Sequence, residues 1–555
     1  MKIGSKITNK KAEFTVLGKP FFSIGGQTHN SSSYYPEDMD RSFRSVKELG
    51  GNTVATPLCW DRFEREEGCF DDDYVRRIID QARNWGMHLA FLWFATWKNG
   101  TMEYTPPWVK LDQVRFPRTL CHDMSPTAVL SCHNESNRAA DEKAFCRLMG
   151  VIKEYDENVG TVIAVQIENE PGIIGATRRD FGPDGERDFT APVPQKLIDY
   201  MKTHPNGRLY GFWMAAGGVE SGNWTEMFGS YGAEAVSAWY TARYIDSIAA
   251  AGKKVYDLFL YANAWLDGGE QGANWDIGGL EYPCGGPVSK SLDVWYAACD
   301  TLDVIAPDNY QGETERHMEV NRFYANPDDG WPLYVPESHA AGLNATMMFY
   351  AIGELGAIGY HIFACESCLD NDGLLKDNAK VMQRSMQMLS HASGLIREHR
   401  QDGKMHAIYQ RAGDSASHLK LDGWKCRVCF TGHGYGWNAM DFRHHEAIKE
   451  EVELVTDVHG ETGRGLLFQV SENEFYMVGH KVRLLFNRYE PEDGSLPPTM
   501  LNPSHQANST GMLIVEEGSF VDGKYVPVRT RSGDEARHGI WAQADCGVIH
   551  FILCD

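Results

Sequence analysis

The chain has 555 residues, of which 43% are hydrophobic and 12% aromatic, a composition typical of a folded globular protein. This length is too great for one compact core and predicts about two to four domains, although an α/β barrel with insertions can occupy most of it. The 53 basic and 76 acidic residues give a formal net charge of -23, which argues against nucleic acid or an anionic membrane as a partner. A neutral substrate is expected instead.

The N-terminal segment and the cysteines bear on the compartment. Residues 1–11 are basic but contain neither an apolar segment nor a small-residue cleavage site, so no secretory signal is predicted. No run of roughly 18 or more apolar residues occurs, and the thirteen cysteines, an odd number spread along the chain, fit reduced thiols. We therefore predict a cytoplasmic protein, although a secreted chain without its signal would look the same.

Eight short apolar runs alternate with helical stretches in the first 395 residues, which is the pattern of a parallel sheet with crossover helices. One series of eight such strands predicts a closed (β/α)8 TIM barrel over residues 1–395. The predicted strands are Phe21 to Gly26, Thr53 to Leu58, His88 to Ala95, Thr161 to Glu168, Tyr256 to Asn263, Leu302 to Pro307, Pro332 to Pro336 and Ala357 to Ala364.

Helical periodicity is clearest in two segments between or after these strands. Asp73 to Trp85 places its apolar side chains on one face and is followed by Gly86, which can end a helix. Asn378 to Leu395 shows the same period, and its methionines are expected to pack in the core. Long insertions are predicted after strand three, from residue 99 to about 137, and after strand four, from residue 172 to about 230, on the side that carries barrel active sites.

After residue 396 the pattern changes to short segments of partial period-two alternation, separated by Gly, Asp and Asn. Gly465 to Val478 and Gly547 to Leu553 are examples of such segments. This pattern predicts a C-terminal β-sandwich accessory domain over residues 396–555.

Carboxylates stand at the ends of two predicted barrel strands. The fourth strand runs into Glu168, Asn169 and Glu170, and the seventh is followed directly by Glu337. Side chains at the carboxyl ends of barrel strands project into the active-site mouth. A pair of carboxyl groups there fits glycoside hydrolysis with retention, in which one group protonates the departing oxygen and the other, about 5 Å away, attacks the anomeric carbon. Burial and the neighbouring charge would raise the pKa of the acid, and donors such as Tyr310 would keep the nucleophile ionised.

The same residues resemble a known family. Gln166-Ile-Glu-Asn-Glu170, the strand end at Pro336-Glu337 and the opening Gly18-Lys-Pro-Phe-Phe22 are similar to glycoside hydrolase family 35, in the clan of retaining barrels that includes family 42. Further likeness to its bacterial β-galactosidases with a compact C-terminal β domain lies in Gly51 to Val54, Trp93 to Gly100 and Glu517 to Pro527, so the resemblance spans most of the chain.

This resemblance implies that Glu170 is the acid/base, that Glu337 is the nucleophile and that Asn169 binds the sugar 2-hydroxyl. The chain departs from the family at strand three, where many members carry Ala-Glu-Trp and this chain has Ala95-Thr96-Trp97. The missing carboxylate bears on which sugar is bound.

Other residues near predicted strand ends are candidates for sugar contact, because pyranose C–H faces pack on aromatic rings and hydroxyls need fixed polar partners. The aromatic candidates are Trp60, Trp97, Trp265 and Tyr310, and each could equally belong to the core. The polar candidates are Gln27, Asn99, Asn263 and Glu366. Glu168 is interpreted as a buried carboxylate paired with an arginine, in preference to a direct contact with the sugar.

Several patterns that look like metal or nucleotide sites are interpreted otherwise. Cys365 and Cys368 stand at a strand end, whereas Cys426 and Cys429 lie in a predicted β segment where residues three apart face opposite sides. His444 and His445 lack a metalloprotease pattern, and the glycines of residues 432–436 are not followed by a helix. No metal and no cofactor are predicted.

The sequence thus predicts a retaining exo-β-glycosidase, in the first place a β-galactosidase, that acts on a neutral oligosaccharide or glycoside by double displacement. One alternative is a catalytically inactive barrel that binds carbohydrate. Another is a retaining glycosidase for β-glucosides, β-xylosides or α-L-arabinosides, because a few hydrogen bonds decide between such sugars. A homo-oligomer is compatible with the sequence.

Overall fold

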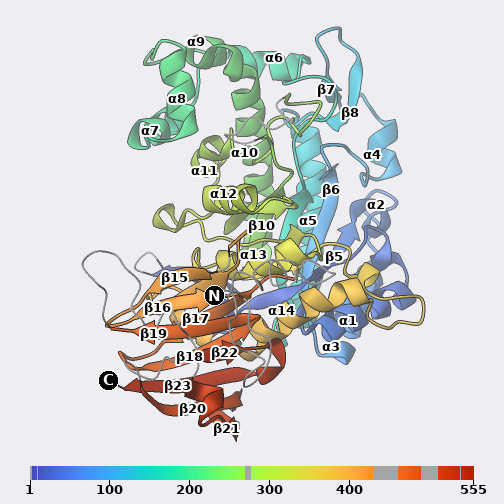
Figure 1. Ribbon diagram of the computed structural model, residues 1–555. Helices are drawn as coiled ribbons and strands as arrows, with labels where there is room; N and C mark the ends of the chain where they lie inside the picture. Colours follow the sequence, from blue (N-terminus) through green and yellow to red (C-terminus); the bar gives the residue numbers. More distant parts are fainter. Residues whose placement is uncertain are drawn as a thin grey trace.

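The computed structural model describes residues 3–8, 11–268, 277–414, 416–430, 461–488, 511–537 and 539–554. A barrel occupies the middle of the molecule in Figure 1, with a group of helices at one end and antiparallel sheets at the other. Residues 432–436, His444 and His445 lie outside the described ranges. Across these ranges, no helix has both the length and the apolar character needed to cross a membrane.

The barrel consists of eight parallel strands, as the alternating pattern predicted. Their order around the sheet follows the chain, from β4 through β12, with β13 beside β4. Most of these strands are buried along their whole length because helices cover them outside and side chains fill the inside. The strands are β4 (Ser23–Gln27), β5 (Thr53–Cys59), β6 (His88–Lys98), β9 (Val162–Asn169), β10 (Phe259–Ala264), β11 (Val304–Asn309), β12 (Glu337–Ser338) and β13 (Gly359–Ile362).

The seventh strand differs from its prediction. Residues 332–336 were expected to pair along their length, but β12 comprises only Glu337 and Ser338, which pair with Asp308 and Asn309 of β11. An isolated parallel bridge from Val335 to Tyr360 joins this segment to β13 on its other side. Two prolines in the segment, Pro332 and Pro336, lack the N–H that a continuous ladder requires.

A helix follows each barrel strand and packs on its outside. The helix after β5, α3 (Asp72–Trp85), confirms the periodicity seen in the sequence, and its C-terminal Gly86 has a φ of 66°. The predicted helix at 378–395 is instead two helices, α14 (Lys380–His391) and α15 (Ser393–His399), with Val381, Met382 and Met386 buried. The remaining covering helices are α1 (Pro36–Leu49), α5 (Glu135–Asp156), α10 (Gly232–Val255), α11 (Leu292–Ala298), α12 (Thr314–Tyr324) and α13 (Gly342–Gly353).

A small N-terminal sheet, which was not predicted, lies against the start of the barrel strands. Its antiparallel strands are β1 (Ile3–Thr8), β2 (Lys11–Val16) and β3 (Lys19–Pro20). Phe14 packs on Phe259, the first residue of β10, with ring centroids 4.9 Å apart. This sheet therefore covers the end of the barrel opposite the predicted active site.

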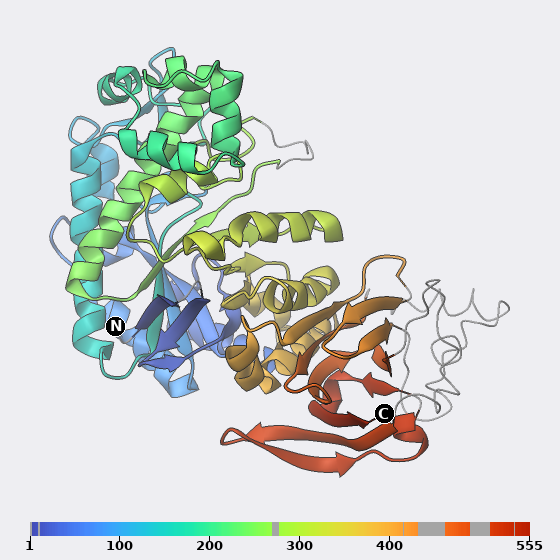
Figure 2. The same cartoon turned by 90° about the vertical axis from the view of Figure 1, so that its left-hand side faces the viewer.

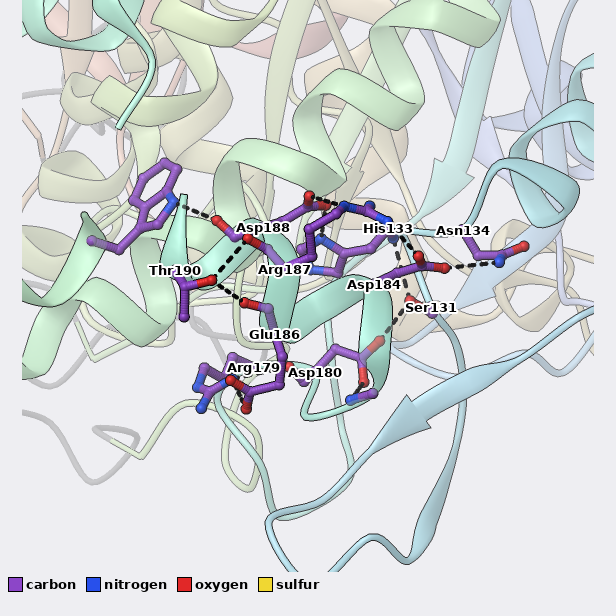
Figure 3. Close-up of polar contacts among 12 residues, drawn as sticks. Ser131, His133, Asn134, Arg179, Asp180, Asp184, Glu186, Arg187, Asp188 and Thr190 are labelled. Atoms are coloured by element: carbon purple, nitrogen blue, oxygen red, sulfur yellow. Dashed lines mark hydrogen bonds and ion pairs between the residues drawn. The ribbon is translucent and has the colours of Figure 1, made fainter. Parts of the chain in front are cut away.

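The two long insertions lie together at the other end of the barrel (Figures 1 and 2). The first contains α4 (Pro107–Leu111) and the hairpin of β7 (Arg118–Leu120) and β8 (Pro126–Leu130). The second contains α6 (Pro183–Thr190), α7 (Gln195–Thr203), α8 (Arg208–Ala215) and α9 (Trp224–Phe228). Polar side chains join them: Asp180, Asp184 and Asp188 bind Ser131, Asn134 and His133, respectively (Figure 3).

The C-terminal region forms two antiparallel sheets around a shared apolar core, as a β-sandwich requires. One sheet has six strands, in the order β14 (Met405–Tyr409), β17 (Arg464–Gln469), β18 (Glu474–His480), β23 (Val548–Cys554), β20 (Gly511–Val521) and β21 (Lys524–Thr530). The other has β15 (Ala416–Lys420), β16 (Lys425–Cys429), β19 (Val482–Asn487) and β22 (Ile540–Ala542). A short helix, α18 (Asp534–Arg537), precedes β22.

The larger sheet packs on the barrel through α13 and α14. The boundary predicted between residues 395 and 396 falls inside α15, and the first sandwich strand begins at Met405. Leu466, Phe468 and Val478 of the sandwich belong to the same continuous cluster of buried residues as the barrel core.

Candidate active site

The fourth barrel strand ends in a strained turn that presents Glu170. Glu168 has a φ of 63° and Glu170 a φ of 47°, a left-handed conformation that is uncommon for residues other than glycine. The turn is held by its neighbours, because the Glu170 N–H donates to Asn263 Oδ1 at 2.8 Å and the Gly100 N–H donates to the Glu170 carbonyl at 3.0 Å. Strain of this kind persists where surrounding contacts impose it, and it is concentrated at functional sites.

Glu168 supports this turn from the side facing β6. The β6–β9 ladder is irregular here, since residues 94–97 oppose Glu168 alone. Glu168 Oε2 accepts hydrogen bonds from the N–H groups of Ala95 at 3.3 Å and Trp97 at 2.7 Å, so it satisfies the backbone of the bulge. Burial and the nearby Asp141 raise the pKa of Glu168 well above its usual range. The predicted burial is confirmed, but the expected arginine partner is wrong, because Asp141 takes that place.

Glu337 lies across the barrel mouth from this turn and receives four hydrogen bonds. Gln27 Nε2 donates to its Oε1 at 2.7 Å, and the amides of Asn169 and Asn263 donate to the same oxygen at 3.3 and 3.4 Å. The predicted bond from Tyr310 is present, with its hydroxyl 2.7 Å from Glu337 Oε2. All four partners in these contacts are donors, and hydrogen bonds of this kind favour the charged form of a carboxyl group.

Glu170 and Glu337 come together with a third acid, Asp308 of β11. One carboxyl oxygen from each of the three lies within 4.8 Å of one from each of the others. Burial, followed by the charge of Glu337, raises the pKa of Glu170 to about 7, against the opposing effects of Lys98 and of a hydrogen bond with Asp308. The geometry therefore pairs a carboxyl group that holds a proton near neutral pH with a hydrogen-bonded carboxylate.

A cavity of about 430 Å³ opens beside these groups. Glu170, Asp308 and Tyr310 line it, together with Asn99 and Trp265, two of the predicted sugar contacts. Gln311 and Arg316 also line the cavity and were not predicted. An aromatic ring, an amide and a guanidinium beside two acids suit a polar, ring-shaped ligand.

Two predicted sugar contacts, Trp60 and Trp97, are wrong, and a third, Glu366, stays a prediction. Trp60 is fully buried, with its indole N–H bound to Glu64 at 2.8 Å, so it belongs to the core. Trp97 is 1% exposed and packs edge-on against Tyr244, because the bulge in β6 turns its ring away from the cavity. Glu366 accepts hydrogen bonds from the His29 N–H and from Ser32 and Ser42, and thereby joins the loop after β4 to α1.

Two further polar residues at the site, Asp308 and Lys98, were missed. Asp308 follows directly on the predicted strand that ends at Pro307, so the rule that identified Glu170 and Glu337 could also have found it. Lys98 donates to Asn169 Oδ1 at 2.7 Å and thereby fixes which way that amide points. The signal for Lys98 was weak, since it lies in a largely apolar strand that continues three residues beyond its predicted end.

All thirteen cysteines of the chain are free thiols.

Comparison with known proteins gives partial matches. Residues 382–543 match a family model described as a domain of unknown function, DUF5597. No curated protein matches the chain. The match to DUF5597 covers α14, α15 and most of the sandwich, and leaves the barrel strands outside it.

Several solved structures are similar to about two thirds of this chain at low identity. The catalytic domain of β-amylase from Paenibacillus polymyxa is 11% identical, covering 65% of this chain and 97% of that one, with a TM-score of 0.47. The β-galactosidase from Rahnella sp. R3 is 13% identical, covering 68% and 57%, with a TM-score of 0.44. An exo-β-1,4-mannosidase from an Opitutaceae bacterium is 14% identical, covering 67% and 60%, with a TM-score of 0.41. Each TM-score is below 0.5, and the chemistry of the site therefore rests on its own side chains.

Proposed function

We propose that the protein is a retaining exo-β-glycosidase and that its preferred substrate carries a terminal β-galactosyl group. The observation that supports this most strongly is the approach of Glu170 and Glu337 to within 4.8 Å of each other at the mouth of the barrel. Carboxyl groups of retaining enzymes are about 5 to 5.5 Å apart, whereas inverting enzymes leave room for a water molecule between groups about 6.5 to 9.5 Å apart. The short separation favours direct attack by one carboxylate.

The two acids are suited to different roles in this mechanism. Glu337, held by four donors, attacks the anomeric carbon while the protonated Glu170 gives its proton to the departing oxygen. In the second step Glu170, now a carboxylate, takes a proton from the water that releases the sugar. Asn169 is proposed to bind the 2-hydroxyl of the sugar, with its amide orientation set by Lys98.

The preference for galactose rests on the sequence resemblance to family 35, and the substitution at strand three qualifies it. Thr96, where family members carry glutamate, donates to Asp141 Oδ2 at 2.7 Å and is fully buried. The side chain at that position therefore faces α5 rather than the cavity. Recognition of the sugar hydroxyls is proposed to rest on Asn99, Trp265 and Tyr310 instead.

Nitrophenyl glycosides of β-galactose, β-glucose, β-xylose and α-L-arabinose test this proposal. We expect the wild-type protein to release nitrophenol fastest from the galactoside and Glu337→Gln to lower kcat by several orders of magnitude, since it removes the nucleophile. Glu64→Gln is the matched control, because Glu64 is a buried carboxylate of the same barrel that binds Trp60. A near-normal rate in Glu337→Gln would refute the mechanism, and sugar binding without turnover by the wild type would point to a carbohydrate-binding barrel.

A further inference from the structure

Asp308 is a third carboxyl group in the site, and the two-carboxylate mechanism assigns it no role. It lies near the end of β11 and pairs in register with Glu337 of β12. Neighbouring residues in register on parallel strands face the same side, so both side chains point into the barrel mouth. Asp308 is 2% exposed and borders the cavity beside Glu170.

The two oxygens of Asp308 have different environments. Oδ2 accepts a hydrogen bond of 2.6 Å from Asn263 Nδ2, the amide that also reaches Glu337. Oδ1 is buried and has no hydrogen-bond donor among the described residues. The neighbouring groups that remain are the carboxyls of Glu170 and Glu337. If Asp308 were ionised, this buried oxygen would lack a hydrogen-bond donor, which costs free energy. If Asp308 is a neutral acid, the same oxygen can be its hydroxyl and donate a hydrogen bond itself.

The surrounding charges favour the neutral acid. The groups around Asp308 are Glu170 from β9, Glu337 from β12, Lys98 of β6 and four hydroxyls, those of Tyr310, Tyr261, Tyr324 and Tyr334. Arg316 of α12 lines the same cavity, but its guanidinium pairs with Glu319. Three ionised carboxylates this close together would face the Lys98 ammonium group and a guanidinium that already pairs with Glu319, and like charges at such distances do not all ionise. Glu337 has four donors, whereas Asp308 has one. The proton is therefore least favourable on Glu337.

We infer that Asp308 is a positioning residue that stays protonated through the reaction and donates a hydrogen bond from Oδ1 to the carboxyl group of Glu170. This inference rests on the proposed function for the role of Glu170, but the protonation of Asp308 itself can be observed without any reaction. Burial and the charges of Glu337 and Glu170 raise the pKa of Asp308 well above its usual range, in agreement with a neutral acid.

Such a donor helps the step in which Glu170 loses its proton. The proton of Glu170 passes to the departing oxygen, the proton of Asp308 stays in place, and the bond between them becomes a stronger, charge-assisted hydrogen bond. In the second step Glu170 regains a proton from water and the original state returns. Asp308 neither gains nor loses an atom over the cycle.

Two substitutions of Asp308 distinguish a role as a hydrogen-bond donor from a role as a negative charge. Asp308→Ala removes the donor and should lower kcat/KM by roughly 10- to 100-fold, the usual effect of losing a hydrogen bond to a charged group, and more for phenyl than for dinitrophenyl glycosides. Asp308→Asn restores an N–H toward Glu170 and an oxygen toward Asn263, and should recover most of that loss. The fall of kcat/KM on the alkaline side should occur at the same pH in Asp308→Asn as in the wild type.

An ionised Asp308 would give different results. Its replacement by asparagine would remove a negative charge beside Glu170 and move the alkaline fall of kcat/KM down by about one pH unit or more. A further outcome that overturns the inference is loss of activity in Asp308→Asn as deep as in Glu170→Gln, since Asp308 would then be the acid itself.

Infrared difference spectra test the protonation directly and need no substrate. At pH 7, the spectrum of the wild type minus that of Asp308→Asn should contain the carbonyl stretch of a protonated carboxyl group. Its absence overturns the inference even if the enzyme proves active, whereas its presence in a protein that cleaves no glycoside would refute only the proposed function. Asp308→Asn is close to isosteric, so both tests remain possible if Asp308→Ala fails to fold.

Discussion

Single residues at this site are set apart by their hydrogen-bond partners more than by their chemical type. Glu168, Glu170 and Glu337 are all buried glutamates at barrel strand ends. Glu168 binds backbone N–H groups of a bulge, Glu170 faces other acids and Glu337 receives side-chain donors. Their proposed roles as a structural acid, a proton donor and a nucleophile follow from these surroundings.

The pH dependence of the reaction should report on Glu170. Its pKa of about 7, raised by burial and by the charge of Glu337, means that the group is protonated below pH 7 and loses its proton above it. We therefore expect kcat/KM to fall about tenfold for each pH unit well above 7. The profile should be measured with a nitrophenyl galactoside, and Glu170→Gln should abolish this fall. An alkaline fall that survives in Glu170→Gln would contradict the assignment.

The sequence predicted much of the site because polar residues after buried strands are informative. Gln27, Asn169, Asn263 and Tyr310, all predicted, do meet at Glu337. The errors arose where the direction of a side chain depends on local irregularity. The bulge at residues 94–97 turns Trp97 outward, and the helical turn that starts at Trp60 takes that ring into the core.

At the level of elements, the two insertions act as one unit at the mouth of the barrel. His133, from the first, pairs with Asp188 of α6 at 2.9 Å, and the two side chains are 1% and 10% exposed. Burial opposes the charge of His133, but Cys132, the hydrogen bond to Asp188 and the charge of Asp180 raise its pKa to about 10. The pKa of Asp188 is lowered by the same hydrogen bond and by Arg187, against the effect of burial.

His133→Gln should lower the free energy of unfolding by about 3 to 5 kcal/mol near pH 6, as expected when one partner of a buried ion pair is lost. The folded pKa of His133 is above its unfolded value of about 6.5, so its contribution is complete below pH 6.5 and is lost as the pH rises toward 10. Urea unfolding at pH 6 and pH 10 should show this decrease. His204→Gln is the control, because its pair with Asp329 is about one-third exposed. Equal losses for the two variants, or a loss of the same size at both pH values, would contradict this account.

The sequence predicted the positions of most elements, with two exceptions, the N-terminal sheet and the seventh barrel strand. Seven of the eight barrel strands and both insertions lie where the apolar runs and their spacing placed them. The N-terminal sheet was missed because its strands are only two to six residues long. The alternation of polar and apolar residues in Lys11–Val16 was a signal that could have identified one of them. The seventh strand was placed too early because its prolines leave only Glu337 and Ser338 paired with β11.

Across the whole molecule, the sandwich is joined to the barrel by a shared core and a buried ionic network. Arg464 of β17 is fully buried and donates to Ser385 Oγ of α14 at 2.6 Å. Glu461 pairs with Arg464 at 3.1 Å and with Arg384 of α14 at 2.7 Å. The change of pattern after residue 396 predicted a second β region, but the pattern could not reveal that its larger sheet shares a core with the barrel.

Glu461→Gln should destabilise the whole molecule by about 3 to 5 kcal/mol, because it leaves the Arg464 cation buried without its carboxylate. Tryptophan fluorescence and activity should be lost in one urea transition, shifted to lower urea in the variant. Glu535→Gln breaks an exposed pair with Arg529 and should change stability by about 1 kcal/mol or less. Two separate transitions in the wild type would show that barrel and sandwich unfold independently and would contradict the shared core.

The anomeric form of the first product tests the central claim most directly. Proton NMR of a nitrophenyl β-galactoside reaction, recorded before the released sugar equilibrates, distinguishes the two outcomes. Carboxyl groups within 4.8 Å of each other predict that the β anomer of the free sugar appears first and that the α anomer follows only by mutarotation. Initial formation of the α anomer would show that water, not Glu337, attacks the sugar and would contradict the account.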